Sequence, residues 1–171
     1  MKSAITIALV PQIKSGPWVF WENLEDSIAK TAALGFDAVE LFTASATAVD
    51  ATLLQQLLER YRIRICAVGT GAGKVVQGLT LTDSDTNVRE AAIKFISEMI
   101  DFGADYNAPA IIGSMQGNIP QGTERTIALQ WLSEGISILA NKAEKKGVPL
   151  VYEPLNRYET NIVNSFADAV A

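Results

Sequence analysis

Histidine is absent from this 171-residue sequence, and cysteine occurs once, at Cys66. Without histidine the chain offers no Ser-His-Asp or Cys-His nucleophile arrangement and no histidine-based zinc motif. A lone cysteine forms no disulfide within the chain and fits a reducing cytoplasm, where we expect the protein to reside. Any metal ion that these residues bind must therefore have oxygen ligands, which favours a hard or borderline ion such as Mg²⁺ or Mn²⁺.

Long hydrophobic runs and an excess of basic residues are missing as well. No apolar run approaches the ~20 residues that span a bilayer, so we expect no membrane association. The apolar segment 4–10 lacks the cleavage site of a signal peptide and is better explained as a buried strand. The net charge of −5 argues against binding to a nucleic-acid backbone, although it leaves room for a small anionic substrate.

The remaining composition is that of a globular protein, with 49% hydrophobic and 19% charged residues, and it suffices for one domain. Five apolar runs predict strands at 5–10, 37–41, 63–69, 109–112 and 149–153. Segments of helical periodicity between them predict helices at 24–32, 53–61, 88–102 and 123–146. This alternation predicts a parallel sheet with helices packed outside it.

Caps mark several of these helices. Asp50 precedes the second helix, and Asn87 with Glu90 resembles a capping box at the start of the third. The segment 83–87 resembles the start of a calcium loop but lacks the required glycine and closing glutamate, so we assign it to helix capping.

Two architectures fit this order of elements, an open flavodoxin-like sheet and part of a (β/α)₈ barrel of ~250 residues. A complete doubly wound domain would close with a full amphipathic helix over the sheet edge, whereas the last helical signal stops at Ala171 without an end signal. We therefore predict that residues 1–171 are the N-terminal part of a single TIM-barrel domain. It is an incomplete (β/α)₈ barrel of about five βα units, with the remaining strands absent from this chain.

Glu153 ends the fifth predicted strand, because Pro154 has no N–H with which to continue the ladder. If Leu150 and Tyr152 face the helices, Val151 and Glu153 point into the barrel. A charge at the carboxyl end of a parallel strand is typical of an active site, and a salt bridge with a neighbouring residue is the structural alternative.

Glu40 repeats this pattern on the second strand, where Ala38 and Glu40 point inward; a buried, paired acid is an equally good explanation. The segment 113–117 ends the fourth strand, and its small residues leave room for a ligand beside Gly113 and Gln116. Aromatic residues at 17–21 could wall a pocket or serve as ordinary packing. Cys66, in the middle of a strand, is most simply a core residue.

The glycine-rich segment 69–74 invites a phosphate-loop interpretation, but the P-loop pattern would need glycine at Val68 and serine or threonine at Val75. The dinucleotide fingerprint would need a helix opening at once, and 75–81 does not resemble one. We interpret the segment as a flexible backbone turn at the rim of the barrel, with Lys74 as a possible anion contact.

The sequence Glu-Pro-Leu-Asn-Arg-Tyr-Glu at 153–159 resembles the sugar phosphate isomerase/epimerase family, the xylose-isomerase-like TIM barrels that include the ketose 3-epimerases. Segments 39–42, 69–71 and 111–114 agree in order, so the resemblance covers essentially the whole chain. It implies a (β/α)₈ barrel with a divalent metal, Mn²⁺, Mg²⁺ or Co²⁺. It also implies a sugar or sugar phosphate as the small-molecule partner.

By this resemblance Glu153 is a metal ligand and one of two acid/base carboxylates. Glu159 contacts substrate hydroxyls, and Asn156 and Arg157 shape the mouth, with Glu40, Gly113 and Gln116 as further substrate contacts. The family's other metal ligands, an aspartate, a histidine and a second glutamate, lie on later strands and are not in this chain. The implied activity is isomerisation or epimerisation, in which a carboxylate removes a proton next to a carbonyl and an enediolate forms.

Two alternatives stay open. The chain fits a non-catalytic sugar-binding domain on the same scaffold, or a half-barrel that completes itself as a homo-oligomer. The endonuclease branch of these barrels is less well matched, because it requires several histidines and a basic groove. The sequence does not distinguish free sugar from sugar phosphate, or isomerase from epimerase or dehydratase, and it leaves open whether this segment is active alone.

Overall fold

The structure is a computed structural model that describes residues 1–13, 18–21 and 23–170. The N-terminal half comprises β1 (Ala4–Leu9), α1 (Leu24–Ala33), β2 (Ala38–Thr43), α2 (Ala51–Tyr61), β3 (Arg64–Gly69) and α3 (Ala72–Gln77). The C-terminal half comprises α4 (Thr86–Ala104), β4 (Ala110–Ile112), the 3₁₀ turn η1 (Ser114–Gln116), α5 (Arg125–Lys146), β5 (Leu150–Tyr152) and α6 (Phe166–Val170). The five predicted strands and the four predicted long helices are confirmed, with small shifts at their ends.

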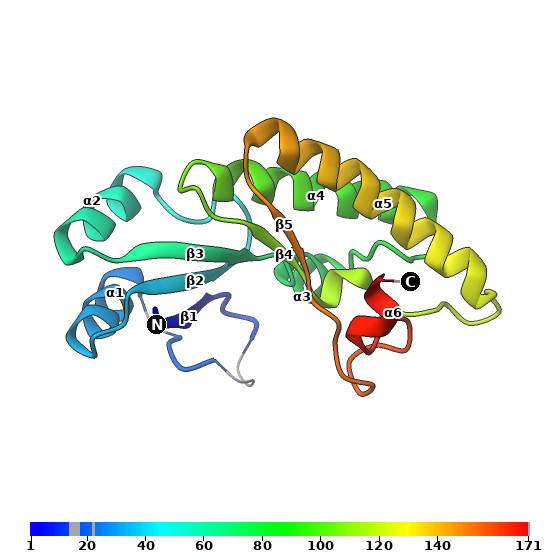
Figure 1. Cartoon of the computed structure of the whole chain (residues 1–171), viewed down its shortest axis with the longest axis horizontal. Coiled ribbons are helices and arrows are strands. Elements are labelled where there is room, and N and C mark those ends of the chain that lie inside the picture. Colours follow the sequence, from blue (N-terminus) through cyan, green and yellow to red (C-terminus); the bar gives the residue numbers. More distant parts are fainter. Residues whose placement is uncertain (14–17, 22, 171) are drawn as a thin grey trace.

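The five strands form one parallel sheet in the order β1-β2-β3-β4-β5. Each strand therefore pairs with the next one along the chain, through a crossover that contains a helix, as in a barrel. Helices α4 and α5 lie together over β4 and β5, and α2 lies over the N-terminal strands (Figure 1). The chain thus forms an incomplete TIM barrel, as predicted.

The strand register assigns each side chain to a face. Leu41, Val68, Ala110 and Leu150 are aligned across β2 to β5, and the first three of them are fully buried against the helices. The next row is Phe42, Gly69, Ile111 and Val151, which faces the other way because successive residues alternate. We call this second side the open face, because Val151 is 38% exposed on it.

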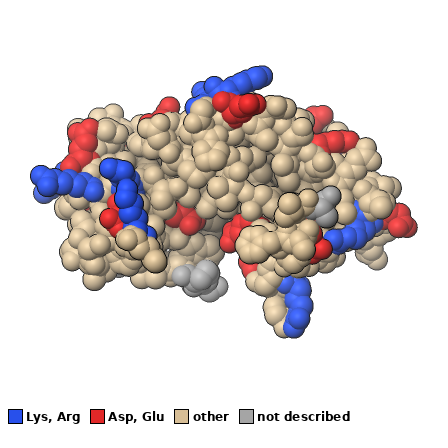
Figure 2. Space-filling model, in the orientation of Figure 1, with Lys and Arg blue, Asp and Glu red and all other residues tan. Residues whose placement is uncertain are grey.

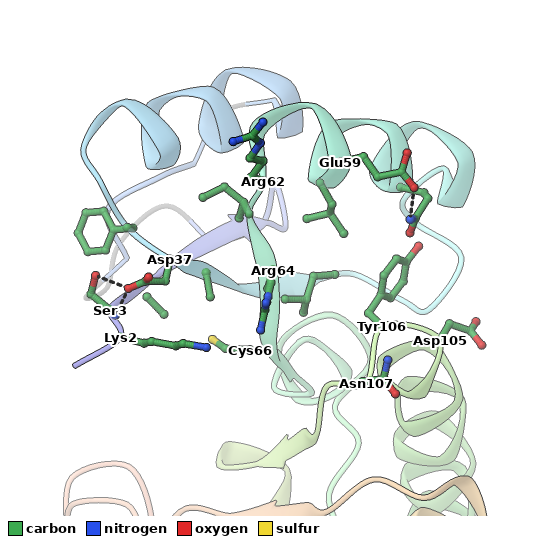
Figure 3. A pocket seen from close by; sticks show the side chains of 17 residues that line it. Lys2, Ser3, Asp37, Glu59, Arg62, Arg64, Cys66, Asp105, Tyr106 and Asn107 are labelled. Atoms are coloured by element: carbon green, nitrogen blue, oxygen red, sulfur yellow. Dashed lines mark hydrogen bonds between the residues drawn. The ribbon is translucent and has the colours of Figure 1, made fainter.

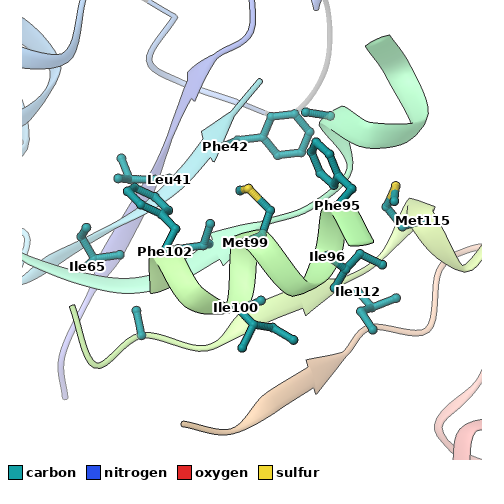
Figure 4. Packing of buried hydrophobic residues seen from close by; sticks show 14 of the residues in the cluster. Leu41, Phe42, Ile65, Phe95, Ile96, Met99, Ile100, Phe102, Ile112 and Met115 are labelled. Atoms are coloured by element: carbon teal, nitrogen blue, oxygen red, sulfur yellow. The ribbon is translucent and has the colours of Figure 1, made fainter. Parts of the chain in front are cut away.

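A large part of the hydrophobic core lies between the sheet and helix α4 (Figure 4). Ile96, Met99 and Ile100 of α4 are fully buried, and they pack with Leu41 and Ile112 from the sheet. Burial of side chains of this size stabilises the fold by ≈ 1.5–3 kcal/mol each relative to exposure. The apolar residues that recur with helical periodicity in 88–102 are therefore those that pack the helix against the strands.

The prediction that Cys66 is a core residue was wrong, because its side chain is exposed. The pairing of β2 with β3 shifts between Val39 and Glu40: Val39 pairs with Ile65, but Glu40 pairs with Ala67. Cys66 is the extra residue of this bulge. A bulge interrupts the alternation from which sequence patterns assign faces.

The helix caps are partly as expected. Asp50 accepts a hydrogen bond from the N–H of Leu53 at 2.8 Å, as predicted. Helix α4 begins earlier than expected, and its N-cap is Asp85, which accepts from the N–H of Asn87 at 2.8 Å. The capping box on Asn87 is therefore wrong, whereas the assignment of 83–87 to helix capping is confirmed.

At the N-terminal ends of β1, β2 and β3 a cavity of about 1000 Å³ opens, lined by residues that include Lys2, Asp37, Arg64, Cys66 and Asn107 (Figure 3). It lies at the opposite end of the strands from Glu153. In TIM barrels that end serves stability rather than chemistry. None of the helices in the described ranges is both long and apolar enough to cross a membrane.

Candidate active site

Glu153 is the first residue after β5, at the carboxyl end of the strand. Its N–H still donates to the carbonyl of Ile112 at 3.0 Å, and the ladder then ends at Pro154. The register places Glu153 on the open face, two residues beyond Val151, and its side chain is exposed. The strand therefore delivers a carboxylate to the rim, in the direction that the alternation of the sequence predicts.

Glu40 lies on the same face, two residues before Phe42 in β2. The hydroxyl of Thr6 donates to its Oε2 at 3.3 Å, across the β1–β2 pair. The pKa of Glu40 is raised above its ordinary value, chiefly because burial removes water from the charged form. The Thr6 hydrogen bond opposes this rise, and the negative charge of Glu153 adds to it. The two predicted acids are thus electrostatic neighbours.

A glycine lies beside each of these carboxylates. A Cβ on Gly113 would lie 2.9 Å from Oε2 of Glu153, closer than such contacts allow. A Cβ on Gly69 would lie 3.4 Å from Oε1 of Glu40 and only 2.7 Å from the ring of Phe42. Acidic side chains lie on both sides of the notch in the lower middle of the molecule (Figure 2).

Gln116 does not reach solvent, since its exposed fraction is 0%. Its amide nitrogen donates to the carbonyls of Gly113 at 3.1 Å and Glu153 at 3.2 Å. Its amide oxygen accepts from the hydroxyl of Tyr152 at 2.7 Å. The structure thus uses this side chain to join the ends of β4 and β5, and its predicted contact with substrate stays a prediction.

The loop 154–161 carries the other predicted site residues, which are exposed. Asn156 donates from its side chain to the carboxylate of Glu159, and its side-chain oxygen accepts from the N–H of Tyr158 at 2.9 Å. The guanidinium of Arg157 lies 5.1 Å from the ring centre of Tyr158 and donates to its hydroxyl at 3.0 Å. Asn156 and Glu159 are therefore brought together, while Arg157 is held against Tyr158.

This loop is fixed to the segment that follows β4. The hydroxyl of Thr160, itself buried, donates to the carbonyl of Gly117 at 2.7 Å. Asn161 accepts at its side chain from the N–H of Ile119 at 2.7 Å, and its own N–H donates to the side chain of Asn118 at 3.0 Å. These hydrogen bonds therefore fix the loop 154–161 in place next to the segment that follows β4.

The interpretation of 69–74 as a flexible turn was wrong in part, because a short helix, α3, opens at Ala72. Gly73 lets this helix approach the core: a Cβ there would lie 2.8 Å from the sulfur of Met115 and 2.9 Å from the ring of Phe95. Packing has overridden the low helix propensity of glycine. Lys74 lies within α3, partly exposed, and its role as an anion contact stays a prediction.

Aromatic rings border the same end of the sheet. The ring of Trp18 lies 5.3 Å from that of Phe42 and 5.7 Å from that of Trp21. Pro17, which belongs to the same predicted aromatic segment, lies outside the described residues. Sequence reasoning missed Thr6 as a partner of Glu40. Only the register of β1 against β2, which no local pattern encodes, brings these two residues together.

The divalent metal that the resemblance implies would need several oxygen ligands from the side chains of the chain. Within residues 1–13, 18–21 and 23–170, no group of three or more His, Cys, Asp or Glu side chains is arranged to hold a metal ion. Glu153 and Glu40 provide carboxylate oxygens that suit Mg²⁺ or Mn²⁺, but they are only two. The described residues therefore do not fit a complete metal site by themselves.

Comparison with known proteins now identifies the architecture. A family model described as a xylose isomerase-like TIM barrel matches residues 28–171. No curated protein sequence matches the chain significantly.

Three solved structures illustrate the similarity. A D-allulose 3-epimerase from Methylomonas sp. in complex with D-allulose superposes with a TM-score of 0.69 at 21% identity, covering 85% of this chain and 50% of the enzyme. A 3-keto-D-glucoside 4-epimerase from E. coli gives 0.74 at 16% identity, covering 99% and 62%. An AP endonuclease, family 2, from Brucella melitensis gives 0.70 at 15% identity, covering 96% and 59%. The chain thus spans between 50% and 62% of the lengths of these proteins, and the similarity at this identity concerns the fold.

Proposed function

This chain belongs to the xylose isomerase-like TIM barrel family, and from that premise we propose that it is part of a sugar or sugar-phosphate isomerase or epimerase. The observation that supports this proposal most is the exposed carboxylate of Glu153 at the carboxyl end of β5, on the same face as Glu40. Enzymes with this architecture place their reacting groups at that end of the strands. Several solved structures of similar fold are named as sugar epimerases.

In the proposed reaction Glu153 removes a proton from the carbon next to a carbonyl, and the substrate becomes an enediolate. A second carboxyl group, protonated and on the opposite side of that carbon, delivers a different proton, which inverts the centre and leaves Glu153 protonated and the second group ionised. General acid–base catalysis of this kind contributes about 10²–10⁴-fold to the rate. Glu153 suits the role of base because its side chain is exposed on the open face.

The other predicted residues take binding roles in this proposal. Glu159 and Asn156, already in contact with one another, hydrogen-bond the sugar hydroxyls, and Arg157 shapes the mouth. Glu40 contacts a substrate oxygen from β2. Gly113, by lacking a side chain, leaves room for the carboxylate of Glu153 and lies beside the substrate in this proposal.

We propose that Glu153 is also one ligand of a divalent metal ion, Mn²⁺, Mg²⁺ or Co²⁺. Two carboxylates do not complete a metal site, so the other ligands would come from outside the residues described. This agrees with the proposal that residues 1–171 are the N-terminal part of one barrel domain. The reading frame beyond Ala171 tests it, and a continuation with Asp, His and Glu at the ends of further strands is the expected result.

The function is tested by proton exchange rather than by product alone. The protein is incubated in D₂O with Mn²⁺ and a panel of ketoses and ketose phosphates, and deuterium incorporation next to the carbonyl is followed by NMR. We expect Glu153→Gln to lower the exchange rate by about 100-fold or more. Glu90→Gln, which alters an exposed acid on α4, is the matched control. Exchange that survives Glu153→Gln would refute the assignment of the base.

A second candidate, a non-catalytic sugar-binding domain or self-completing half-barrel, is favoured by the incomplete donor set and the exposed Val151. A parallel sheet is normally covered on both faces, and a second copy of the chain would supply such a cover. Native mass spectrometry tests the half-barrel form of this candidate: a stable symmetric dimer without proton exchange supports self-completion, and a monomer contradicts it.

A further inference from the structure

The side chain of Gln116 continues the connection between β4 and β5 beyond the point where the backbone ladder ends. The last backbone bond runs from the N–H of Glu153 to the carbonyl of Ile112, and Pro154 has no N–H for a further one. Just beyond, the carbonyl of Glu153 accepts from the amide nitrogen of Gln116 at 3.2 Å. The same nitrogen donates to the carbonyl of Gly113 at 3.1 Å. One buried amide therefore holds both strand ends.

Tyr152 fixes which way this amide is turned. Its hydroxyl donates to Oε1 of Gln116 at 2.7 Å, which leaves the amide nitrogen directed at the two carbonyls. The hydroxyl and the amide oxygen are thus matched as donor and acceptor.

The backbone of Gln116 is also held by the loop between α3 and α4. The hydroxyl of Thr82, which is fully buried, shares its one hydrogen between the carbonyls of Gln116 at 2.9 Å and Asn118 at 2.7 Å. The N–H of Gln116 donates to the carbonyl of Gly113 at 3.0 Å. The backbone that carries the amide is therefore fixed, and a side chain that is to hold a neighbouring strand in place needs such support.

We propose that Gln116 is a positioning residue for Glu153, and that the Tyr152 hydroxyl acts through it by setting the orientation of its amide. This inference rests on the proposed function for its catalytic consequence, but its structural part does not. Gln116 touches the backbone of Glu153 and no exposed surface, so it acts on the base rather than on substrate. Misplacement of a reacting group by about 1 Å costs on the order of 10²-fold in rate.

Amide hydrogen exchange tests the inference without any need for activity. Gln116→Met keeps the length of the side chain but removes its three hydrogen bonds, and Tyr152→Phe removes only the hydroxyl. Thr31→Val on α1 is the matched control, since it removes another buried side-chain bond, from Thr31 to the carbonyl of Ser27 at 2.8 Å. We expect the protection of the Glu153 amide to fall roughly tenfold more in Gln116→Met than in Thr31→Val, with a smaller fall in Tyr152→Phe.

The kinetic arm measures proton exchange from the ketose by the same variants. We expect Gln116→Met to lower kcat by about tenfold or more with little change in KM, because the base is misplaced while substrate contacts remain. If the protection of the Glu153 amide falls no more in Gln116→Met than in the control Thr31→Val, the inference is overturned, whatever the activity of the variants. If instead protection falls but Glu153→Gln keeps wild-type exchange, the proposed function fails and the positioning of the strand end stands.

Discussion

The carboxylate of Glu153 occupies space that a side chain on residue 113 would need, since a Cβ there would lie 2.9 Å from Oε2. Glycine at the end of β4 is thus matched to glutamate at the end of β5. The neighbour in this contact is the far end of an exposed side chain, which can move away at little cost. A substitution at residue 113 should therefore disturb the position of the acid more than the fold.

For Gly113→Ala we accordingly expect proton exchange to fall by about tenfold or more, by misplacement of the base, while the melting temperature changes little. The double variant Gly113→Ala/Glu153→Asp shortens the acid and should recover part of any Glu153-dependent function relative to Gly113→Ala. Deuterium incorporation and thermal denaturation measure the two effects. A large loss of stability with normal exchange would show that Gly113 serves the backbone instead.

Glu40 should make the stability of the protein depend on pH in a characteristic direction. Its pKa is raised in the fold, so between its ordinary value of 4.5 and the raised value the folded state binds more protons than the unfolded state. Stability from this group is therefore present below that range and is lost as pH rises through it. Glu40→Gln removes the free-energy cost of a partly buried negative charge and keeps an oxygen that accepts the hydrogen bond from Thr6.

We therefore expect Glu40→Gln to raise the melting temperature at pH 7 by a few degrees and to have little effect at pH 4. Thermal denaturation across this range checks the prediction, with Glu90→Gln as the control for removing an exposed acid. A destabilised Glu40→Gln at pH 7 would show that Glu40 is paired as an anion, which is the structural alternative considered from the sequence.

The sequence was sufficient for the sheet because its information is local. Each apolar run ends at a recognisable break, such as Pro154 after β5, and the helical segments between the runs dictate parallel pairing. Alternation then placed Glu40 and Glu153 on the same side. Their orientation follows from a period of two and needs no tertiary information.

What the sequence could not supply depends on contacts between distant segments. Helix α3 forms because Gly73 allows close packing against Phe95 and Met115, and glycine by itself signals a turn. The exposure of Cys66 depends on a bulge in the pairing of two strands. The role of Gln116 follows only from the pairing of β4 with β5, because its hydrogen-bond partners Tyr152 and Glu153 lie 36 and 37 residues away in the sequence.

Asp101 joins helices α4 and α5 through two lysines, with Oδ1 at 2.8 Å from Nζ of Lys142 and 2.7 Å from that of Lys146. Hydrogen bonds from these lysines lower the pKa of Asp101 below its ordinary value. Its stabilising effect is therefore present above the ordinary value of 3.8 and is lost as pH falls through the lowered one. The side chain is 40% exposed, so solvent weakens the effect.

For Asp101→Asn we expect a loss of about 0.5–1 kcal/mol in the free energy of unfolding at pH 7 and low salt. The loss should shrink in 1 M NaCl and at pH values where Asp101 is protonated. Urea denaturation gives the free energies. Glu98→Gln is the control, because its pair with Lys94 is longer, at 4.0 Å, and more exposed. Equal losses in the two variants would mean that the two-lysine arrangement adds nothing.

Cys66 lines the cavity at the N-terminal ends of the strands and lies near Glu40 of the open face. The residue is exposed on the bulge of β3, but part of its side chain is buried, and this burial, with a further contribution from the charge of Glu40, raises the pKa of the thiol. A raised pKa leaves less thiolate at neutral pH, so alkylation should be slow but complete and should accelerate as pH rises. Glu40→Gln removes the nearby charge and should accelerate alkylation at pH 7.

Iodoacetamide labelling followed by intact mass measurement tests this at several protein concentrations. If the protein is a monomer with an uncovered open face, we expect one label per chain, at a rate that does not depend on protein concentration. A second copy of the chain seated on that face would bury Cys66 beside Glu40, and the labelling rate would then fall as concentration rises. The same thiol therefore separates the incomplete barrel from the self-completing dimer, with Cys66→Ser as the unlabelled control.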